Sequence, residues 1–155
     1  MEKFANVVAI TSTGLLAGAF AYAFFSIVPT FSEVPLEVHF TFRDALMRHN
    51  GVYVQIVMAL SVLTPLWSAY TIRVSDSRRS LAILASLLAA TSFVVTRFGN
   101  VPINQLIKTW SVENLPANWK ALLHTWDRFN LVRSLSALGC FVSFIAATLV
   151  SRPYK

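Results

Sequence analysis

Four long apolar segments divide the chain, and they constrain its fold more than any other feature. They cover about residues 4–28, 52–72, 81–98 and 131–150, and none contains an aspartate or glutamate. A helix rises about 1.5 Å per residue, so about 20 apolar residues cross the roughly 30 Å hydrocarbon core of a bilayer. The pattern predicts an all-α integral membrane protein, an antiparallel four-helix bundle in which residues 1–155 form a single membrane domain.

The composition excludes a soluble globular domain. Hydrophobic residues make up 55% of the chain and charged residues 13%, whereas a soluble domain has about 25% charged residues. A single cysteine, Cys140, excludes a disulfide framework and a cysteine-based metal centre. The net charge of +6 does not indicate nucleic-acid binding, because Lys and Arg are scattered between apolar segments and form no dense patch. We therefore expect a lipid bilayer, and no nucleic acid, as a partner.

An even number of crossings places both termini on one side of the membrane. The short link 73–79 lies on that side too and carries three arginines with one aspartate. Together with Lys3, Arg152 and Lys155 it makes a cation-rich side, so the positive-inside rule predicts cytoplasmic termini for this multi-pass protein. The first segment also resembles a secretory signal peptide, with Ala21-Tyr22-Ala23 placed like a cleavage site, but we interpret it as a retained helix.

The two remaining connections, 30–51 and 99–130, then share the opposite side. We interpret both as loops that are longer than a bundle needs. They hold nearly all the groups that can titrate or bind a ligand, including every histidine: His39, His49 and His124. One end of the bundle therefore carries few side chains that can titrate or bind a ligand, and the other end is the candidate site.

The connection 99–130 carries further helical signals. Gly99-Asn100 followed by Pro102 predicts the end of the third helix. Apolar side chains at helical spacing then predict a short interfacial helix in the third-to-fourth helix loop: Ile103, Leu106, Ile107 and Trp110. From Pro116 a helical pattern continues to about Val150, a length of about 50 Å.

One face of this long fourth helix forms a stripe that enters the membrane. Its members are spaced by seven, four and three residues and so share a face: Trp119, Trp126, Asn130 and Arg133. Arg133 begins the fourth apolar segment and Arg97 ends the third, which predicts similar depths for the two cations. A cation at that depth either faces the bundle interior or extends toward the headgroups, and both alternatives stay open for each arginine.

These residues resemble a known family. The signature N-x-P-x-N … W … W … N-x-x-R of the anthrone oxygenase-like membrane proteins is similar to the run Arg97-Phe98-Gly99-Asn100-Val101-Pro102-Ile103-Asn104 with Trp119, Trp126, Asn130 and Arg133. The first segment, with Gly14, Gly18 and the exit at Pro29, is similar as well. The resemblance implies four membrane helices. A few members of this family are implicated in oxidising polyketide anthrones to anthraquinones, and most have no assigned activity.

The resemblance and the residues together predict a small membrane oxidoreductase, an oxygenase that acts on a flat, lipophilic, phenol- or quinone-like small molecule. Such a reaction needs an aromatic slot, a base that works near neutral pH, and a cation or amide donors for an oxyanion. The candidate catalytic residues are a base and two oxyanion partners: His124 or His39, Arg133 and Asn104. The candidate substrate-binding residues are Trp119, Trp126, Asn130 and Arg97.

Two alternatives stay open. Three histidines on one side, with a carboxylate such as Glu37, would suit a mononuclear iron or copper site or a single haem. No H-x-x-H or H-E-x-x-H spacing supports this, so we assign no metal ligand and leave the cofactor undetermined. The other alternative is a non-catalytic accessory subunit that packs on a larger membrane protein complex through the face of Gly14 and Gly18. A transporter is disfavoured, because no acidic residue lies inside the spans.

Overall fold

The computed structural model describes residues 2–72 and 77–150. Its helical elements, with η for π-helical turns, are α1 Glu2–Tyr22, η1 Ala23–Ile27, α2 Val28–Glu33, α3 Leu36–Thr71, α4 Ser77–Val95, η2 Thr96–Asn100, α5 Val101–Ile107 and α6 Trp119–Leu149. They join into four long apolar rods: Glu2–Glu33, Leu36–Thr71, Ser77–Ile107 and Trp119–Leu149. The predicted all-α four-helix membrane fold is confirmed.

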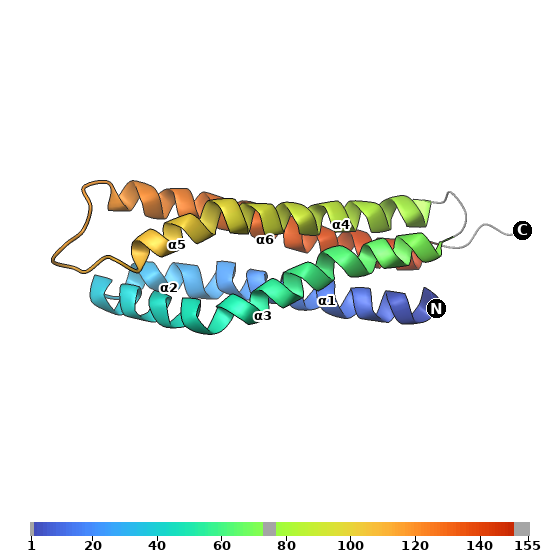
Figure 1. The fold of residues 1–155 in the computed structure, drawn as a ribbon, viewed down its shortest axis with the longest axis horizontal. Coiled ribbons are helices and arrows are strands. Elements are labelled where there is room, and N and C mark those ends of the chain that lie inside the picture. Colours follow the sequence, from blue (N-terminus) through green and yellow to red (C-terminus); the bar gives the residue numbers. More distant parts are fainter. Residues whose placement is uncertain (1, 73–76, 151–155) are drawn as a thin grey trace, which may run out of the picture.

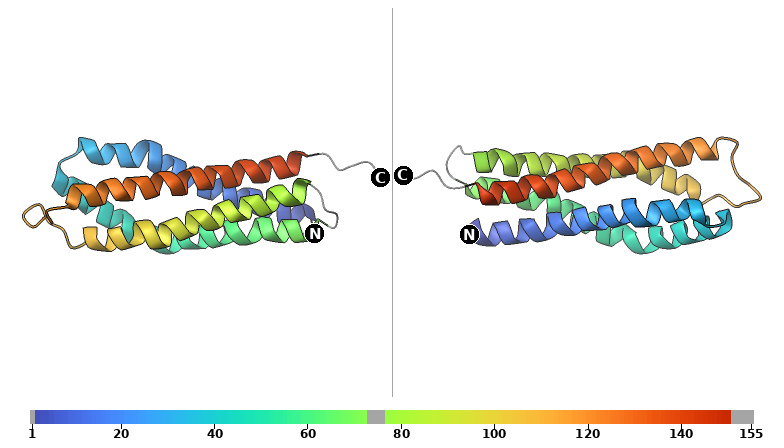
Figure 2. Two further views of the ribbon diagram at one scale, coloured as in Figure 1. Left: turned by 90° about the horizontal axis from the view of Figure 1, so that it is seen from above. Right: turned by 180° about the vertical axis from the view of Figure 1, so that it is seen from behind.

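The four rods run back and forth along one long axis (Figure 1). Each rod contacts two neighbours, in the cyclic order α1, α3, α4, α6 (Figure 2). The start of α1 and the end of α6 lie at one end of the bundle, the terminal end; α2, α5 and the start of α6 lie at the other, the far end. Residues 73–76, Arg152 and Lys155 of the predicted cationic side lie outside the described residues, and the cytoplasmic position of the termini stays a prediction.

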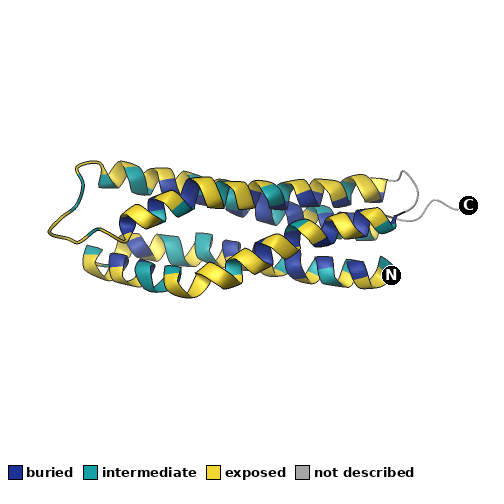
Figure 3. Ribbon diagram, in the orientation of Figure 1, coloured by how far each residue is buried: buried dark blue, intermediate teal, exposed yellow. Residues whose placement is uncertain are grey.

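Buried residues line the inside of the bundle and exposed residues its outside (Figure 3). Many of the buried residues are small, and many large apolar residues are exposed. Completely buried alanines line the helix contacts: Ala5, Ala9, Ala82, Ala85 and Ala89. Large exposed side chains surround them: Phe25, Leu63, Phe98, Val142 and Leu149. Lipid provides no hydrophobic drive for helix association, so membrane helices meet through small residues that allow close packing. This distribution indicates an integral membrane protein.

Close packing and hydroxyl bonds link α1 to its neighbours. The hydroxyl oxygens of Ser12 on α1 and Thr64 on α3 lie 2.8 Å apart. Gly14 packs against the Phe141 ring of α6, where an added Cβ would lie 3.3 Å from the ring, whereas Gly18 faces open space. Only the first glycine of the predicted small-residue pair therefore lies at a helix contact.

In two rods, a π-helical turn allows the helix to continue past an internal proline. The segments Phe25-Ser26-Ile27-Val28-Pro29 and Phe98-Gly99-Asn100-Val101-Pro102 share the pattern F-x-x-V-P, and a π-helical turn precedes each proline. A proline cannot donate a backbone hydrogen bond and collides with the carbonyl four residues before it. In both wide turns the valine N–H instead donates five residues back, to the carbonyls of Ala23 and Thr96. The prediction that the third helix ends at Gly99-Asn100 is wrong, because this turn lets the rod continue to Ile107.

The second rod begins much earlier than its apolar segment. α3 starts at Leu36, so the prediction that 30–51 is a loop is wrong. Pro35 precedes the helix, and its carbonyl accepts the His39 N–H at 2.9 Å. A count of apolar residues misses this stretch because its buried face carries polar groups, among them His39 and Arg43. The extension brings these two side chains to the far end.

The fourth rod is unbroken from Trp119 to Leu149, close to the continuous helix predicted from Pro116. The short helix predicted around residues 103–110 is α5, which forms the end of the third rod and is not a separate helix within a loop. Its Ile103 and Ile107 pack against Trp126 of α6. The interfacial position predicted for this helix stays a prediction.

Candidate functional site

The far end contains an open cavity of about 580 Å³ between α2, the start of α3 and the start of α6. We call it the far-end pocket. Its walls are aromatic, apolar and charged: Val28, Phe31, Ser32, Val34, Leu36, His39, Arg43, Trp119, Lys120, Leu123, His124 and Asp127. Ligand pockets usually enclose about 300–1,000 Å³, and this cavity falls within that range.

One wall of the far-end pocket is a stack of three side chains. The buried His39 ring lies parallel to the Phe31 ring, with centroids 4.5 Å apart. Arg43 Nε donates to His39 Nε2 at 3.1 Å, and the guanidinium carbon lies 4.7 Å from the Phe31 ring centre. Because His39 accepts with Nε2, its other ring nitrogen carries the proton of the neutral imidazole. His39 therefore offers a substrate a donor and no free acceptor.

The other wall belongs to α6, which contributes Trp119, His124 and Asp127. His124 and Asp127 are three residues apart and share a helix face, and both are exposed. The fold thus brings His39 from α3 and His124 from α6 to one pocket. His49 is exposed on α3 and does not line it.

Next to the pocket, two asparagines hold the buried side chain of Trp126. Its Nε1 donates to Asn104 Oδ1 at 2.8 Å, and its backbone carbonyl accepts Asn100 Nδ2 at 3.1 Å. The Arg43 guanidinium carbon lies 4.2 Å from the centre of the Trp126 ring. Asn104 therefore positions Trp126 and does not line the far-end pocket.

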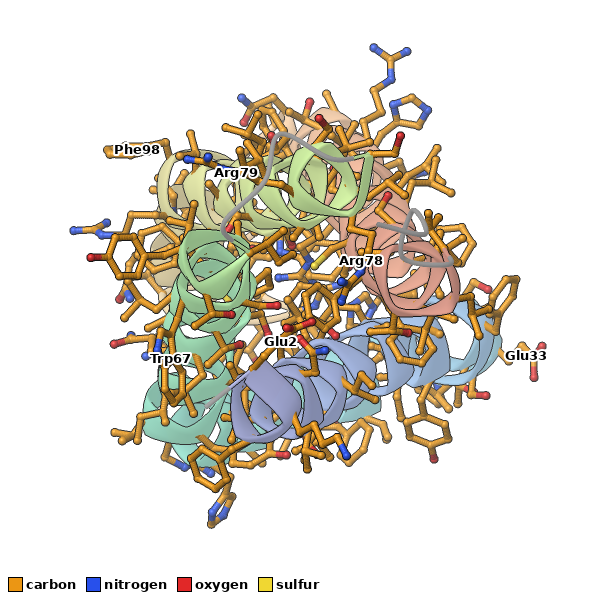
Figure 4. The ribbon with its side chains drawn as sticks, turned by 90° about the vertical axis from the view of Figure 1, so that its right-hand side faces the viewer. Glu2, Glu33, Trp67, Arg78, Arg79 and Phe98 are labelled. Carbon is orange, nitrogen blue, oxygen red and sulfur yellow. The ribbon has the colours of Figure 1, made fainter. Side chains whose placement is uncertain are left out.

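The two arginines compared in the sequence take opposite directions. Arg133 Nε donates to Asn130 Oδ1 at 2.9 Å, and its guanidinium carbon lies 4.7 Å from the Phe20 ring centre, so it faces the bundle interior. Arg97 is exposed, and its guanidinium carbon lies 5.9 Å from the ring of Phe98. Phe98 points outward from the bundle in Figure 4. Arg97 therefore does not join the other predicted site residues.

A close approach between η2 and α6 fixes this region. A Cβ added to Gly99 would lie 2.7 Å from Cγ of the Phe129 ring, closer than real side chains come. Only glycine therefore lets the third rod pack this tightly on α6. The contact brings buried Asn100 within reach of the Trp126 carbonyl.

Comparison with protein families identifies the group to which these residues belong. A family model described as anthrone oxygenase matches residues 42–143. The chain belongs to the anthrone oxygenase family. In this anthrone oxygenase family member, the matched range includes Arg43, His124, Trp126 and Arg133, whereas His39 precedes it. No curated protein and no solved structure matches the chain.

The anthrone oxygenase family member has pocket residues that the sequence analysis did not select: Phe31, Arg43 and Asp127. Arg43 is the most important of the three, because it contacts both His39 and Trp126. A helical signal for it was present, since Pro35 precedes the segment and His39 and Arg43 are one turn apart. The four-residue spacing of His39 and Arg43 has no such meaning if residues 30–51 form a loop.

The side chains present do not fit the three-histidine metal alternative. Across residues 2–72 and 77–150, no three His, Cys, Asp or Glu side chains gather as a metal-binding group. His49 lies outside the pocket, and Glu37 is exposed and does not line it. His39 Nε2 already accepts a bond from Arg43, which also removes one ligand of a bis-histidine haem.

Proposed function

We propose that this protein is a membrane oxygenase that oxidises anthrone-like ketones to quinones at the far-end pocket. The observation that carries the proposal is the meeting of an exposed histidine, a buried arginine and two aromatic side chains at one cavity: His124, Arg43, Phe31 and Trp119. Membership of the anthrone oxygenase family supports it. The lipid-facing bundle supports a lipophilic substrate.

The chemistry needs a base and a place for negative charge. A base removes a proton from the ring methylene of an anthrone, and the electron pair moves to the carbonyl oxygen, which becomes an aromatic oxyanion. Dioxygen adds to the same carbon, and the resulting peroxide takes up a proton. Loss of water leaves a second carbonyl, so anthrone and O₂ give anthraquinone and H₂O. Dioxygen is the oxidant, and the protein supplies proton transfer and charge stabilisation.

We assign the base to His124. It is exposed at the pocket wall, whereas His39 already uses Nε2 to accept from Arg43. After taking the methylene proton, His124 returns it to the peroxide anion. Asp127, three residues further along α6, lies on the same wall of the pocket.

We assign the oxyanion to Arg43 instead of Arg133. Arg43 lines the far-end pocket, and Arg133 does not. His39 holds the Arg43 guanidinium through the 3.1 Å bond to Nε, and the Phe31 ring supports it from one side. A fixed cation in a partly dry cavity stabilises developing negative charge more strongly than one in water. His39 and Phe31 thus act as positioning residues.

The test is dioxygen consumption by the purified protein in lipid nanodiscs with an anthrone as substrate, corrected for oxidation without protein. Replacing His124→Ala should lower the rate about 100-fold or more, the usual contribution of a general base. His49→Ala is the matched control, because it removes an exposed histidine outside the pocket, and it should leave the rate unchanged. An unchanged rate in His124→Ala would contradict the assignment of the base. Equal losses of rate in both variants would contradict the placement of the reaction in the far-end pocket.

A further inference from the structure

Four buried polar atoms have no hydrogen-bond partner among residues 2–72 and 77–150. Two belong to side chains that contact Trp126, and two lie further along the same face of α6. The four atoms are Arg43 Nη1, Asn100 Oδ1, Asn130 Nδ2 and Ser134 Oγ, on side chains that are at most 4% exposed. Arg43 and Asn100 contact Trp126 directly. Asn130 and Ser134 follow it by one and two turns on the same face of α6. Buried polar groups are normally paired, so such a cluster indicates a binding partner.

The same region carries two positive charges. The guanidinium carbons of Arg43 and Arg133 lie 4.2 and 5.4 Å from the centre of the Trp126 ring. The ion pairs formed by the described residues involve other arginines, so no described carboxylate lies within 4.0 Å of either one. Asp127 on α6 acts on Arg43 electrostatically from a greater distance, whereas the charged neighbour that acts on Arg133 is Arg43 itself. Cations at membrane depth are costly unless an opposite charge compensates them.

The unpartnered groups are mainly donors. Arg133 Nε donates to Asn130 Oδ1 at 2.9 Å, which leaves the Asn130 amide N–H groups to donate elsewhere. The free atoms of Arg43 and Asn130 are donors, and the Ser134 hydroxyl is able to donate as well. A water molecule would satisfy some of these donors but would bring no negative charge. An anion satisfies the donors and the charge together.

We propose that the space between Arg43, Asn130 and Arg133 is a binding site for one small monovalent anion, such as chloride or nitrate. Asn130 and Arg133 do not line the far-end pocket, so this site lies beside the substrate cavity and shares only Arg43 with it. The proposal does not depend on the oxidation reaction. Its consequence is structural: the bound anion relieves repulsion between two arginines that share one tryptophan ring.

The test is thermal unfolding of the purified full chain in detergent at constant ionic strength, with sodium nitrate replacing sodium gluconate. Gluconate serves as the bulky comparison anion. A ligand that binds the folded state raises Tm in proportion to the logarithm of its concentration above Kd. We expect a rise in Tm of about 5 °C when nitrate reaches about 100 times its Kd.

Two variants make the test specific. Arg133→Gln should abolish the nitrate-dependent rise in Tm. Arg97→Gln removes the same charge from an exposed position at the end of the third apolar segment, and it should retain the full rise. If Arg133→Gln does not fold, Ser134→Ala provides a milder change and should weaken nitrate binding about fivefold through the loss of one hydrogen bond.

Three results would overturn the proposal. Equal Tm values of the wild type in both salts would mean that water alone fills the space. Equal responses of Arg133→Gln and Arg97→Gln would mean general screening of surface charge. Competition between anthraquinone and nitrate would mean that the anion position is part of the substrate pocket. A protein without oxygenase activity that still shows the specific nitrate response would leave this inference intact.

Discussion

Buried arginines at the two ends of the bundle have opposite surroundings. At the terminal end, Arg78 pairs with Glu2, and its Nε donates to the Ala147 carbonyl at 3.4 Å. Figure 4 shows Arg78 and Glu2 meeting inside the bundle. At the far end, Arg43 is as deeply buried but has a histidine and two aromatic rings as neighbours. Arg78 is thus ion-paired to a carboxylate on another helix, whereas Arg43 has no carboxylate within ion-pair distance among the described residues and only the longer-range charge of Asp127.

The largest effect on stability is expected at the terminal end. Replacing Arg78→Met removes one partner of the Glu2 carboxylate, which is only partly exposed, and should lower the free energy of unfolding by about 3 kcal/mol. SDS titration of the purified protein in mixed micelles measures this change. The double variant Arg78→Met/Glu2→Gln should recover a large part of the loss, because no unpaired charge remains. A double variant no more stable than Arg78→Met would show that the ion pair does not hold this end together.

The two F-x-x-V-P segments offer a second comparison. In the first copy, Ser26 is exposed and Ile27 half-buried; in the second, the equivalent Gly99 and Asn100 are buried against α6. The same π-helical turn thus serves only to pass a proline in one rod, and in the other it also positions a side chain on the Trp126 carbonyl. Both rods share the π-helical turn, and the residues within the turn determine whether it also contacts another helix.

A smaller loss of stability is expected at Gly99, which packs against Phe129, than at Arg78. Gly99→Ala forces a methyl group into the Phe129 ring and should lower the free energy of unfolding by about 1–3 kcal/mol, the usual cost of overpacking. Gly18→Ala is the matched control, since its Cβ would enter open space, and it should be neutral or slightly stabilising. SDS titration of both variants measures the difference. Equal stabilities would contradict the close approach of η2 to α6.

Much of the fold was predictable because apolar length alone identifies membrane helices. The stripe from Trp119 to Arg133 was also readable, since helical spacing places these residues on one face. The extension of α3 was not, because its buried face carries His39 and Arg43 and gives no apolar signal. The sequence does not show that the third rod continues past Pro102, because a proline normally ends a helix and a π-helical turn is not visible in the sequence. Because the sequence hides the extension of α3, it indicates Arg133 for the oxyanion, whereas the structure places Arg43 in the pocket.

We infer that the far-end cation, Arg43, serves the reaction and that the terminal-end cation, Arg78, serves stability. The most direct measurement compares Arg43→Met with Arg78→Met, using both anthrone-dependent dioxygen consumption and SDS unfolding. Arg43→Met should lower turnover about 100-fold in the folded protein, as loss of an oxyanion donor does. It should also cost about 1–3 kcal/mol of stability, because buried His39 Nε2 loses its donor. Arg78→Met should lose stability and retain turnover while folded. Unchanged turnover in Arg43→Met, or a loss of turnover explained entirely by unfolding, would contradict the account.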